Sequence, residues 1–261
     1  MLEDFRLFTI QQRRVETGNY HGLLPREDVN ELLKKDGDFL IRKSEETFGE
    51  EQIYILSVRV AGNKRHYAFC VKQQLIAVDF RLKAHKTIRE FIDAYLSNGD
   101  SISTEAKVFL KKKIGREKWE LAHSTVVTQG TDLGRGTFGV VRRGSFKESP
   151  NGQSVQVAIK VVSQRSSKEQ IKEFMNEARI MRQFNHRNVI KFHGVALGQE
   201  PLMIVMELAT NGSLTDYSKK TTRSPGSKLY MCYGAAAGLE HIHSRDIIYC
   251  GIAAAFSHKT C

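Results

Sequence analysis

Phe39-Leu40-Ile41-Arg42-Lys43-Ser44 is the stretch that decides the fold of the first half of this 261-residue chain. Three consecutive apolar residues are typical of a short strand that is covered on both faces. An arginine at the end of such a strand points towards a partly buried place, where its guanidinium needs an anion. Taken alone, however, Arg42 also fits an ordinary edge arginine that lies in solvent.

The residues around this strand predict a compact α+β sandwich. A short amphipathic helix begins near Pro25, because proline is favoured in the first helical turn and apolar residues follow at helical spacing. A second helix is predicted over residues 87–96, where the apolar residues also recur at helical spacing. Runs rich in β-branched and aromatic residues predict further strands at 53–60, 66–71 and 75–80.

Four motifs in this region, in the right order, resemble those of SH2 domains. Residues 39–44 resemble the FLVRES strand, and residues 20–26 resemble the W-(Y/F)-x-G-x-(I/L)-x-R opening with its tryptophan lost. Arg65-His66-Tyr67 resembles the central K-H-Y, and residues 87–92 resemble the T-(I/L)-x-x-L-I of the second helix. The resemblance implies a central antiparallel sheet between two helices.

The same resemblance implies that the domain binds tyrosine-phosphorylated proteins. Arg42 would grip the phosphate with two N–H groups of its planar fork. Arg26 would reach the phosphate and the ring, Ser44 would donate its hydroxyl, and His66 would line the pocket wall. Ala68 stands where the family often has a lysine, which predicts a weaker affinity.

A glycine loop opens the second half of the chain, at Gly134-x-Gly136-x-x-Gly139. By itself this pattern also fits a dinucleotide-binding fold, but a helix should then follow it. The next residues, 140–144, are strand-like, and no Gly-Lys-Ser/Thr follows as a Walker motif requires. The position of Val141 and the later Val157-Ala158-Ile159-Lys160 agree instead with the kinase pattern.

These residues together resemble the N-lobe of a protein kinase, which implies ATP as the ligand. Lys160 would contact the α- and β-phosphates and pair with Glu177, a residue on a predicted helix over 167–184. Considered singly, Glu177 also fits a solvated helix glutamate. The nucleotide-binding residues that the resemblance implies, with Met206 as the gatekeeper, are Leu133, Gly134, Arg135, Gly136, Thr137, Phe138, Gly139, Val140, Val141, Ala158, Lys160, Glu177 and Met206.

The finer resemblance is to the Fes/Fer group of non-receptor tyrosine kinases. Residues 116–121 match their linker, and Glu177-Ala178-Arg179-Ile180-Met181 matches their helix. The predicted architecture is an SH2 sandwich followed by a kinase-like N-lobe and a fragment of the helical C-lobe. Its predicted parts are an N-terminal extension (1–19), an SH2 domain (20–105), a charged linker (106–125) and a partial tyrosine kinase domain (126–261).

No intact catalytic loop follows. Kinases use an H-R-D-x-x-x-x-N motif, in which Asp accepts the substrate proton and Asn holds magnesium. If Arg245-Asp246 is aligned with this motif, Gly251 occupies the Asn position. If residues 252–254 are aligned with the Ile/Leu-Ala-Ala that follows the motif, Gly251 replaces the base and Phe256 replaces the metal ligand. Both alignments lose the Asn, and no Asp-Phe-Gly occurs in the sequence, so we expect no intact catalytic residue and no metal site.

Two functional hypotheses remain open at this point. In the first, the chain is a phosphotyrosine-binding adaptor or pseudokinase without catalysis. In the second, it is a truncated representation of an active protein-tyrosine kinase, which would transfer phosphate from ATP to protein tyrosine. Nucleic-acid binding would rest on charge alone, since no DNA- or RNA-binding motif is present, and we expect no nucleic-acid partner.

Composition is compatible with both hypotheses. The net charge of +11 favours acidic partners without choosing among them. The four cysteines show no CxxC pair, so we interpret them as free thiols in a reducing compartment. No signal peptide and no apolar run long enough to span a membrane is evident. We therefore expect a cytoplasmic protein that meets the membrane periphery only through its partners.

Overall fold

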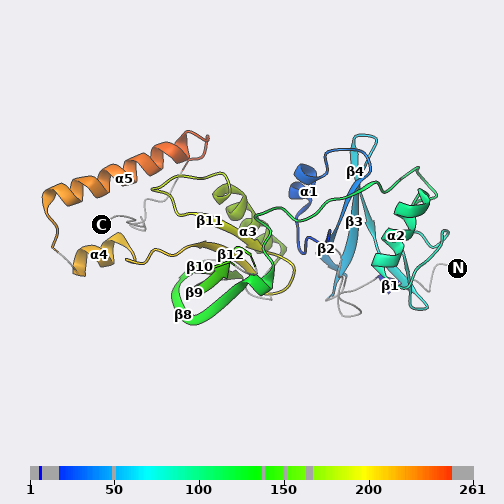
Figure 1. The fold of residues 1–261 in the computed structure, drawn as a ribbon, viewed down its shortest axis with the longest axis horizontal. Helices are drawn as coiled ribbons and strands as arrows, with labels where there is room; N and C mark the ends of the chain where they lie inside the picture. The colour runs from blue at the N-terminus through cyan, green and yellow to red at the C-terminus, as the bar shows by residue number, and fades with distance from the viewer. Residues whose placement is uncertain are drawn as a thin grey trace. The chain divides into compact units, whose positions relative to one another are not determined.

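The computed structural model describes residues 6–7, 18–48, 51–136, 139–149, 152–162, 167–220 and 222–248. The chain divides into two compact units, Met1–Glu120 and Leu121–Cys261. Figure 1 shows helices and strands in both units, which agrees with the predicted α+β class.

The first unit is built on a four-stranded sheet in the order β4-β3-β2-β7. Its three long strands are antiparallel neighbours, and the short β7 runs parallel to β2. A second small sheet has the order β1-β5-β6. The elements of this unit are β1 (Arg6–Leu7), α1 (Arg26–Leu32), β2 (Asp38–Phe48), β3 (Glu51–Val60), β4 (Asn63–Ala68), β5 (Cys70–Lys72), β6 (Leu75–Ala77), α2 (Ile88–Asn98) and β7 (Lys112–Lys113).

Helix α2 has strong signals at both of its ends. The Thr87 hydroxyl accepts the backbone N–H of Glu90, and the Glu90 carboxylate accepts the N–H of Lys86. The first bond satisfies an N–H group that has no partner inside the helix, and the second joins the residue before the cap to the first turn. Gly99 ends the helix at φ 68°, a left-handed conformation in which glycine has no steric penalty.

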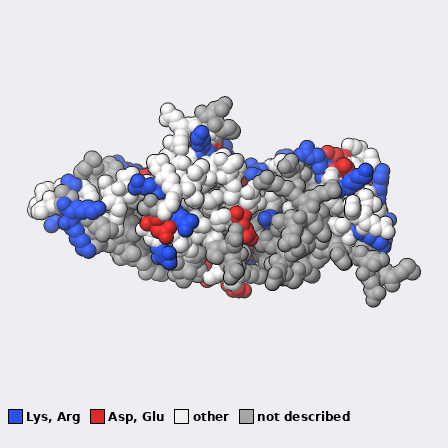
Figure 2. Space-filling model, turned by 90° about the horizontal axis from the view of Figure 1, so that it is seen from below, with Lys and Arg blue, Asp and Glu red and all other residues white. Residues whose placement is uncertain are grey.

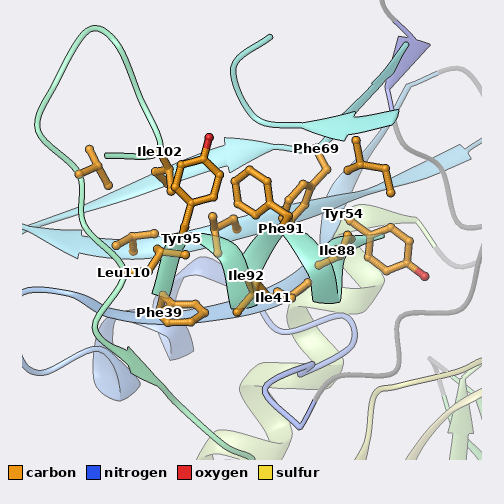
Figure 3. Close-up of a cluster of buried hydrophobic side chains, with 14 of the residues drawn as sticks. Phe39, Ile41, Tyr54, Phe69, Ile88, Phe91, Ile92, Tyr95, Ile102 and Leu110 are labelled. Carbon is orange, nitrogen blue, oxygen red and sulfur yellow. The ribbon is translucent and has the colours of Figure 1, made fainter. Parts of the chain in front are cut away.

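The core of the first unit lies between α2 and the sheet, as Figure 3 shows. Phe91 from α2 is 1% exposed and meets Phe69 edge to face, with ring centroids 5.4 Å apart. Ile92, also fully buried, contributes to the same cluster. The helical spacing that predicted α2 therefore marks the face that the helix buries.

The structure changes two strand predictions and adds a strand. The strand predicted at 66–71 is divided, because Phe69 leaves the ladder, donates its N–H to the Tyr54 carbonyl at 2.9 Å and buries its ring. The strand predicted at 75–80 ends at Ala77. Within the predicted N-terminal extension, Leu7 pairs with Cys70 as part of β1.

The second unit contains a five-stranded antiparallel sheet in the order β11-β12-β10-β9-β8. Helix α3 begins with a capping box in which Ser167 and Gln170 bond each other's backbone N–H. The elements are a 3-10 turn at His123–Thr125, β8 (Val126–Gly136), β9 (Gly139–Lys147), β10 (Ser154–Val162), α3 (Lys168–Met181), β11 (Phe192–Ala196), β12 (Leu202–Glu207), α4 (Leu214–Lys220) and α5 (Pro225–His243).

Neither a membrane-spanning helix nor a metal cluster is found in the part of the chain that the structure describes. No helix there is long and apolar enough to cross a bilayer. No group of three or more His, Cys, Asp and Glu side chains gathers there as a metal site. Cys70 and Cys232 are free thiols, while Cys250 and Cys261 lie outside the described residues.

Figure 2 shows one face of the molecule, on which blue groups of Lys and Arg are more extensive than red groups of Asp and Glu. This agrees with the net charge of +11. A basic surface attracts acidic partners over distances of about one Debye length, roughly 8–10 Å at physiological salt.

Replacing Phe91 by alanine should destabilise the first unit by about 3–5 kcal/mol, because the change leaves a cavity in the core. Urea unfolding followed by circular dichroism measures the loss. Phe109→Ala is the matched control, since Phe109 is 40% exposed and its truncation opens no cavity. Equal destabilisation by both changes would contradict this assignment of the core.

Candidate functional sites

Arg42 is the most deeply buried charge in the first unit's sheet, at 2% exposure. It lies on β2 directly after the apolar stretch that buries this strand. Its Nε donates to the Ser57 hydroxyl at 3.3 Å, and its Nη1 donates to the carbonyls of Lys43 at 3.1 Å and Leu24 at 3.4 Å. These three contacts hold the guanidinium in place on β2.

Ser57 connects Arg42 to His66. Its hydroxyl accepts the Nε–H of Arg42, so the hydroxyl proton is available for Nδ1 of His66, which lies 2.9 Å away. This arrangement leaves the proton of the neutral imidazole on Nε2. Burial and the nearby positive charges of Arg42 and Arg26 lower the pKa of His66 to about 4. The ring is therefore an uncharged donor at neutral pH.

The four residues predicted for phosphotyrosine binding come from three elements. Arg42 and the buried Ser44 lie on β2, His66 lies on β4, and the exposed Arg26 is the first residue of α1. The electrostatic effect of both arginines on His66 places their charges near one ring. Two cations beside a neutral donor favour an anion with several acceptor oxygens, such as a phosphate.

Ser57 is a site residue that sequence reasoning missed. It is fully buried at 0% exposure, in the otherwise apolar stretch 53–58 of strand β3. A hydroxyl buried in such a strand needs partners, because an unpaired polar group there is unfavourable. That mismatch within residues 53–58 is the signal that could have identified it.

In the second unit, the alternation of side chains along β10 separates a core face from a candidate nucleotide face. Val157 and Ile159 pack in the apolar cluster with Val205. Lys160 and the 7%-exposed Ala158, two residues apart, lie on the opposite face. The ladder pairs Ala158 with Met206 of β12 and Lys160 with Val141 of β9.

Lys160 and Glu177 form an ion pair between β10 and α3. The Lys160 side chain is 13% exposed and that of Glu177 is 38% exposed. Phe174 and Ala178, buried on the same helix, fix the face that α3 turns inward. Glu177 is thus a partly exposed helix glutamate that pairs with Lys160 in this structure.

The glycine loop joins β8 to β9. A Cβ added to Gly134 would meet no atom within 4 Å, so the backbone there is open to a ligand. Gly139 differs, because a Cβ built there would lie 2.1 Å from the Val161 carbonyl oxygen of β10. An open glycine backbone near a lysine fits the phosphates of a nucleotide.

The other predicted nucleotide residues have mixed environments. Leu133 is 44% exposed, and the Arg135 side chain is 80% exposed. Gly136 ends β8 and pairs with Gly139, and Val140 and Val141 are partly buried on β9. Thr137 and Phe138 lie outside the described residues.

An ion pair that the sequence did not predict lies near the turn of this hairpin. Arg142 Nε donates to Asp132 Oδ1 at 3.0 Å, across the β8–β9 ladder. Both side chains are more than a third exposed, so the pair adds less than about 1 kcal/mol of stability.

The positions predicted for the catalytic base and the metal ligand, Gly251 and Phe256, lie outside the described residues. The alternative candidate, Arg245-Asp246, lies in the turn that follows α5. There the Arg245 guanidinium donates to the Gln183 carbonyl at 3.3 Å, and Asp246 has a φ of 58°.

Comparison with known proteins finds a family match in each of the two units. The SH2 domain model matches residues 19–95, and the protein tyrosine and serine/threonine kinase model matches residues 127–255. The chain therefore contains an SH2 domain and a tyrosine kinase domain region, and over most of its length it is similar to kinases of the Fer and Fps group. Among its relatives in this group are proteins of animals and of retroviruses.

Fer-related kinase 1 of Caenorhabditis elegans is 34% identical over 237 residues, which cover 90% of this chain and 60% of that protein. Human tyrosine-protein kinase Fer is 32% identical over 238 residues, covering 90% of this chain and 28% of that kinase. Spermatocyte protein spe-8 of C. elegans is 34% identical over 241 residues, covering 90% and 46%. The chain thus spans less than two thirds of each relative.

His66 should remain neutral until the pH falls to about 4. The unfolded chain takes up this proton near pH 6.5, so the stability that neutral His66 contributes is complete above 6.5 and is lost as pH falls from 6.5 through 4. An NMR titration of the ring measures the midpoint. A midpoint near 6.5 would contradict the buried position beside Arg42.

Proposed function

We propose that this protein is a phosphotyrosine-docking adaptor whose kinase segment holds a nucleotide without transferring its phosphate. The phosphotyrosine-docking part of this proposal rests on the buried Arg42, which Ser57 holds next to a neutral His66. A buried cation beside an uncharged donor suits a doubly charged ligand.

Phosphotyrosine fits these groups for electrostatic reasons. Its phosphate carries about −1.5 to −2 charges at pH 7 and three acceptor oxygens. Arg42 supplies the buried charge, and the exposed Arg26 supplies a second positive charge at the rim. Ser44 and the Nε2–H of His66 add neutral donors. The ligand's charge is then stabilised in a place where water competes poorly.

The nucleotide part of the proposal rests on Lys160, Glu177 and the open backbone at Gly134. ATP when bound would bring its own triphosphate charge to Lys160. The ion pair orients the lysine, and Ala158 opposite Met206 leaves a small side chain on the face that would take the base. The kinase family implies ATP as the ligand.

The absence of catalysis is proposed from residues 249–256. With Gly251 in the place of the base, no side chain accepts the substrate proton, a loss of roughly 10²–10⁴ in rate. With Phe256 in the place of the asparagine, a magnesium ligand is also gone, and phosphoryl transfer depends on that charge. We therefore propose nucleotide binding that depends little on magnesium.

The alternative function is an active tyrosine kinase of which this sequence is a piece. The formed Lys160–Glu177 pair favours it, because active kinases require this pair. The intact mass of the protein from native tissue separates the two proposals. A mass that matches 261 residues supports the adaptor, and a larger mass supports the kinase.

Arg42→Ala should abolish phosphopeptide binding, with a loss of about 2–5 kcal/mol, because it removes one member of a buried charge pair. Isothermal titration with phosphotyrosine peptides measures the affinity. Arg89→Ala is the control, since Arg89 is an exposed arginine on α2. Unchanged affinity in Arg42→Ala would remove the basis for the docking function.

ATP should bind with similar affinity with and without Mg²⁺, and Lys160→Ala should weaken binding roughly tenfold by removing a charge-assisted contact. Lys147→Ala, at an exposed position on β9, should leave the affinity unchanged. A phosphotransfer assay on the purified chain completes the test. Metal-dependent tyrosine phosphorylation would overturn the proposal and support the kinase alternative.

A further inference from the structure

The start and the end of the first unit meet on the outer edge of β2. Residues 19–22 follow this edge, where His21 N–H donates to the Ile41 carbonyl and Lys43 N–H donates to the Gly22 carbonyl. Residues 111–114 follow the same edge further along. There Ile114 N–H donates to the Phe39 carbonyl at 2.9 Å. Two separate segments thus cover one edge of the sheet.

His21 joins these two segments through its side chain. Its Nδ1 lies 2.7 Å and 2.9 Å from the two carboxylate oxygens of Glu120, and its Nε2 lies 3.0 Å from the Ile114 carbonyl oxygen. The side chains of His21 and Glu120 are 0% and 3% exposed. His21, at the beginning of the domain, therefore contacts both Ile114 and Glu120 of the segment that leaves the domain.

Both ring nitrogens of His21 face oxygens that, as a carboxylate and a carbonyl, only accept. An imidazole with one proton donates from one nitrogen and presents a lone pair from the other. The imidazolium form donates from both, and its charge is matched by Glu120. All the contacts are hydrogen bonds only in that form, because in the neutral ring one of the two acceptors meets a lone pair.

Further bonds fit this arrangement. The Arg116 guanidinium donates to the Tyr20 carbonyl at 2.9 Å, and Glu117 N–H donates to the Glu120 carboxylate at 3.1 Å. Arg116, Glu117 and Tyr20 are thus titratable residues linked to the pair by these bonds or by their place in the chain. Burial raises the pKa of Tyr20, so the phenol brings no negative charge that could compete with Glu120.

We propose that His21 and Glu120 form a charge-switched clasp, which holds segment 114–120 against the start of the first unit while His21 is an imidazolium and loosens it when the ring loses a proton. The segment that the sequence predicts as a charged linker would then belong to the folded domain in one protonation state and be released in the other. This proposal is independent of the phosphotyrosine and nucleotide functions.

Trp119 gives the proposal a local readout. It is the only tryptophan of the chain, it is partly buried, and it precedes Glu120. Release of the segment should expose its indole, which shifts the emission to longer wavelength and increases quenching by acrylamide. In the full chain, the Trp119 signal and an NMR titration of the His21 ring should change at the same pH.

The variant Glu120→Gln keeps the shape of the side chain but removes its charge. It should increase acrylamide quenching of Trp119 and speed amide exchange in residues 114–120 roughly ten- to hundredfold, because a charge-assisted bond in a buried place is lost. Glu117→Gln is the matched control, since the Glu117 side chain is exposed and only its backbone bonds Glu120.

Each outcome decides the proposal. Coincident titration of His21 and Trp119 in the wild-type chain, with faster exchange in Glu120→Gln and not in Glu117→Gln, supports the clasp. A Trp119 fluorescence signal that does not change when His21 changes its protonation overturns the proposal. If Glu120→Gln loses its circular dichroism signal, the wild-type titration still decides, because it needs no variant.

Discussion

The burial of one guanidinium organises the first unit. An unpaired buried charge is unfavourable by several kcal/mol, and Arg42 avoids this through oxygens from three places: the Ser57 hydroxyl on β3 and the carbonyls of Leu24 and Lys43. These segments must keep their register for Arg42 to be solvated by the protein. The need to stabilise the buried Arg42 charge therefore links the sheet and the segment that leads into α1 to the candidate phosphate site.

The second unit obeys a simpler constraint, the two-residue period of a strand. On β10 one set of side chains fills the apolar cluster, and the other set carries Ala158 and Lys160. A register shift by one residue would bury Lys160 and expose Ile159. The packing of the sheet thus determines where the lysine can meet Glu177 of α3.

Local patterns in the sequence predicted most of this architecture. The apolar run before Arg42, the helical spacing around Phe91 and the glycine loop before Lys160 each depend on neighbours within a few residues, and the structure contains the predicted elements. The division of the strand at Phe69 was not predicted, because it depends on packing against Phe91 in a distant helix.

In the candidate sites, too, local sequence patterns do not predict contacts between distant residues. Arg42 and Lys160 stand in motifs that sequence comparison recognises, whereas Ser57 acts only through its position across the sheet from both Arg42 and His66. The pair of His21 and Glu120 joins residues 99 positions apart. No periodicity links two such residues, and only the meeting of two segments on the edge of β2 brings them together.

Gly139 also limits what a substitution in the glycine loop can reveal. The Val161 carbonyl occupies the space that any side chain at this position would need. Even an alanine would push β9 away from β10 and disturb the strand that carries Lys160, whether or not a nucleotide is present. A variant at Gly139 would therefore report on the closeness of two backbones, whereas Gly134, with open space beside it, is the glycine whose replacement isolates contact with a ligand.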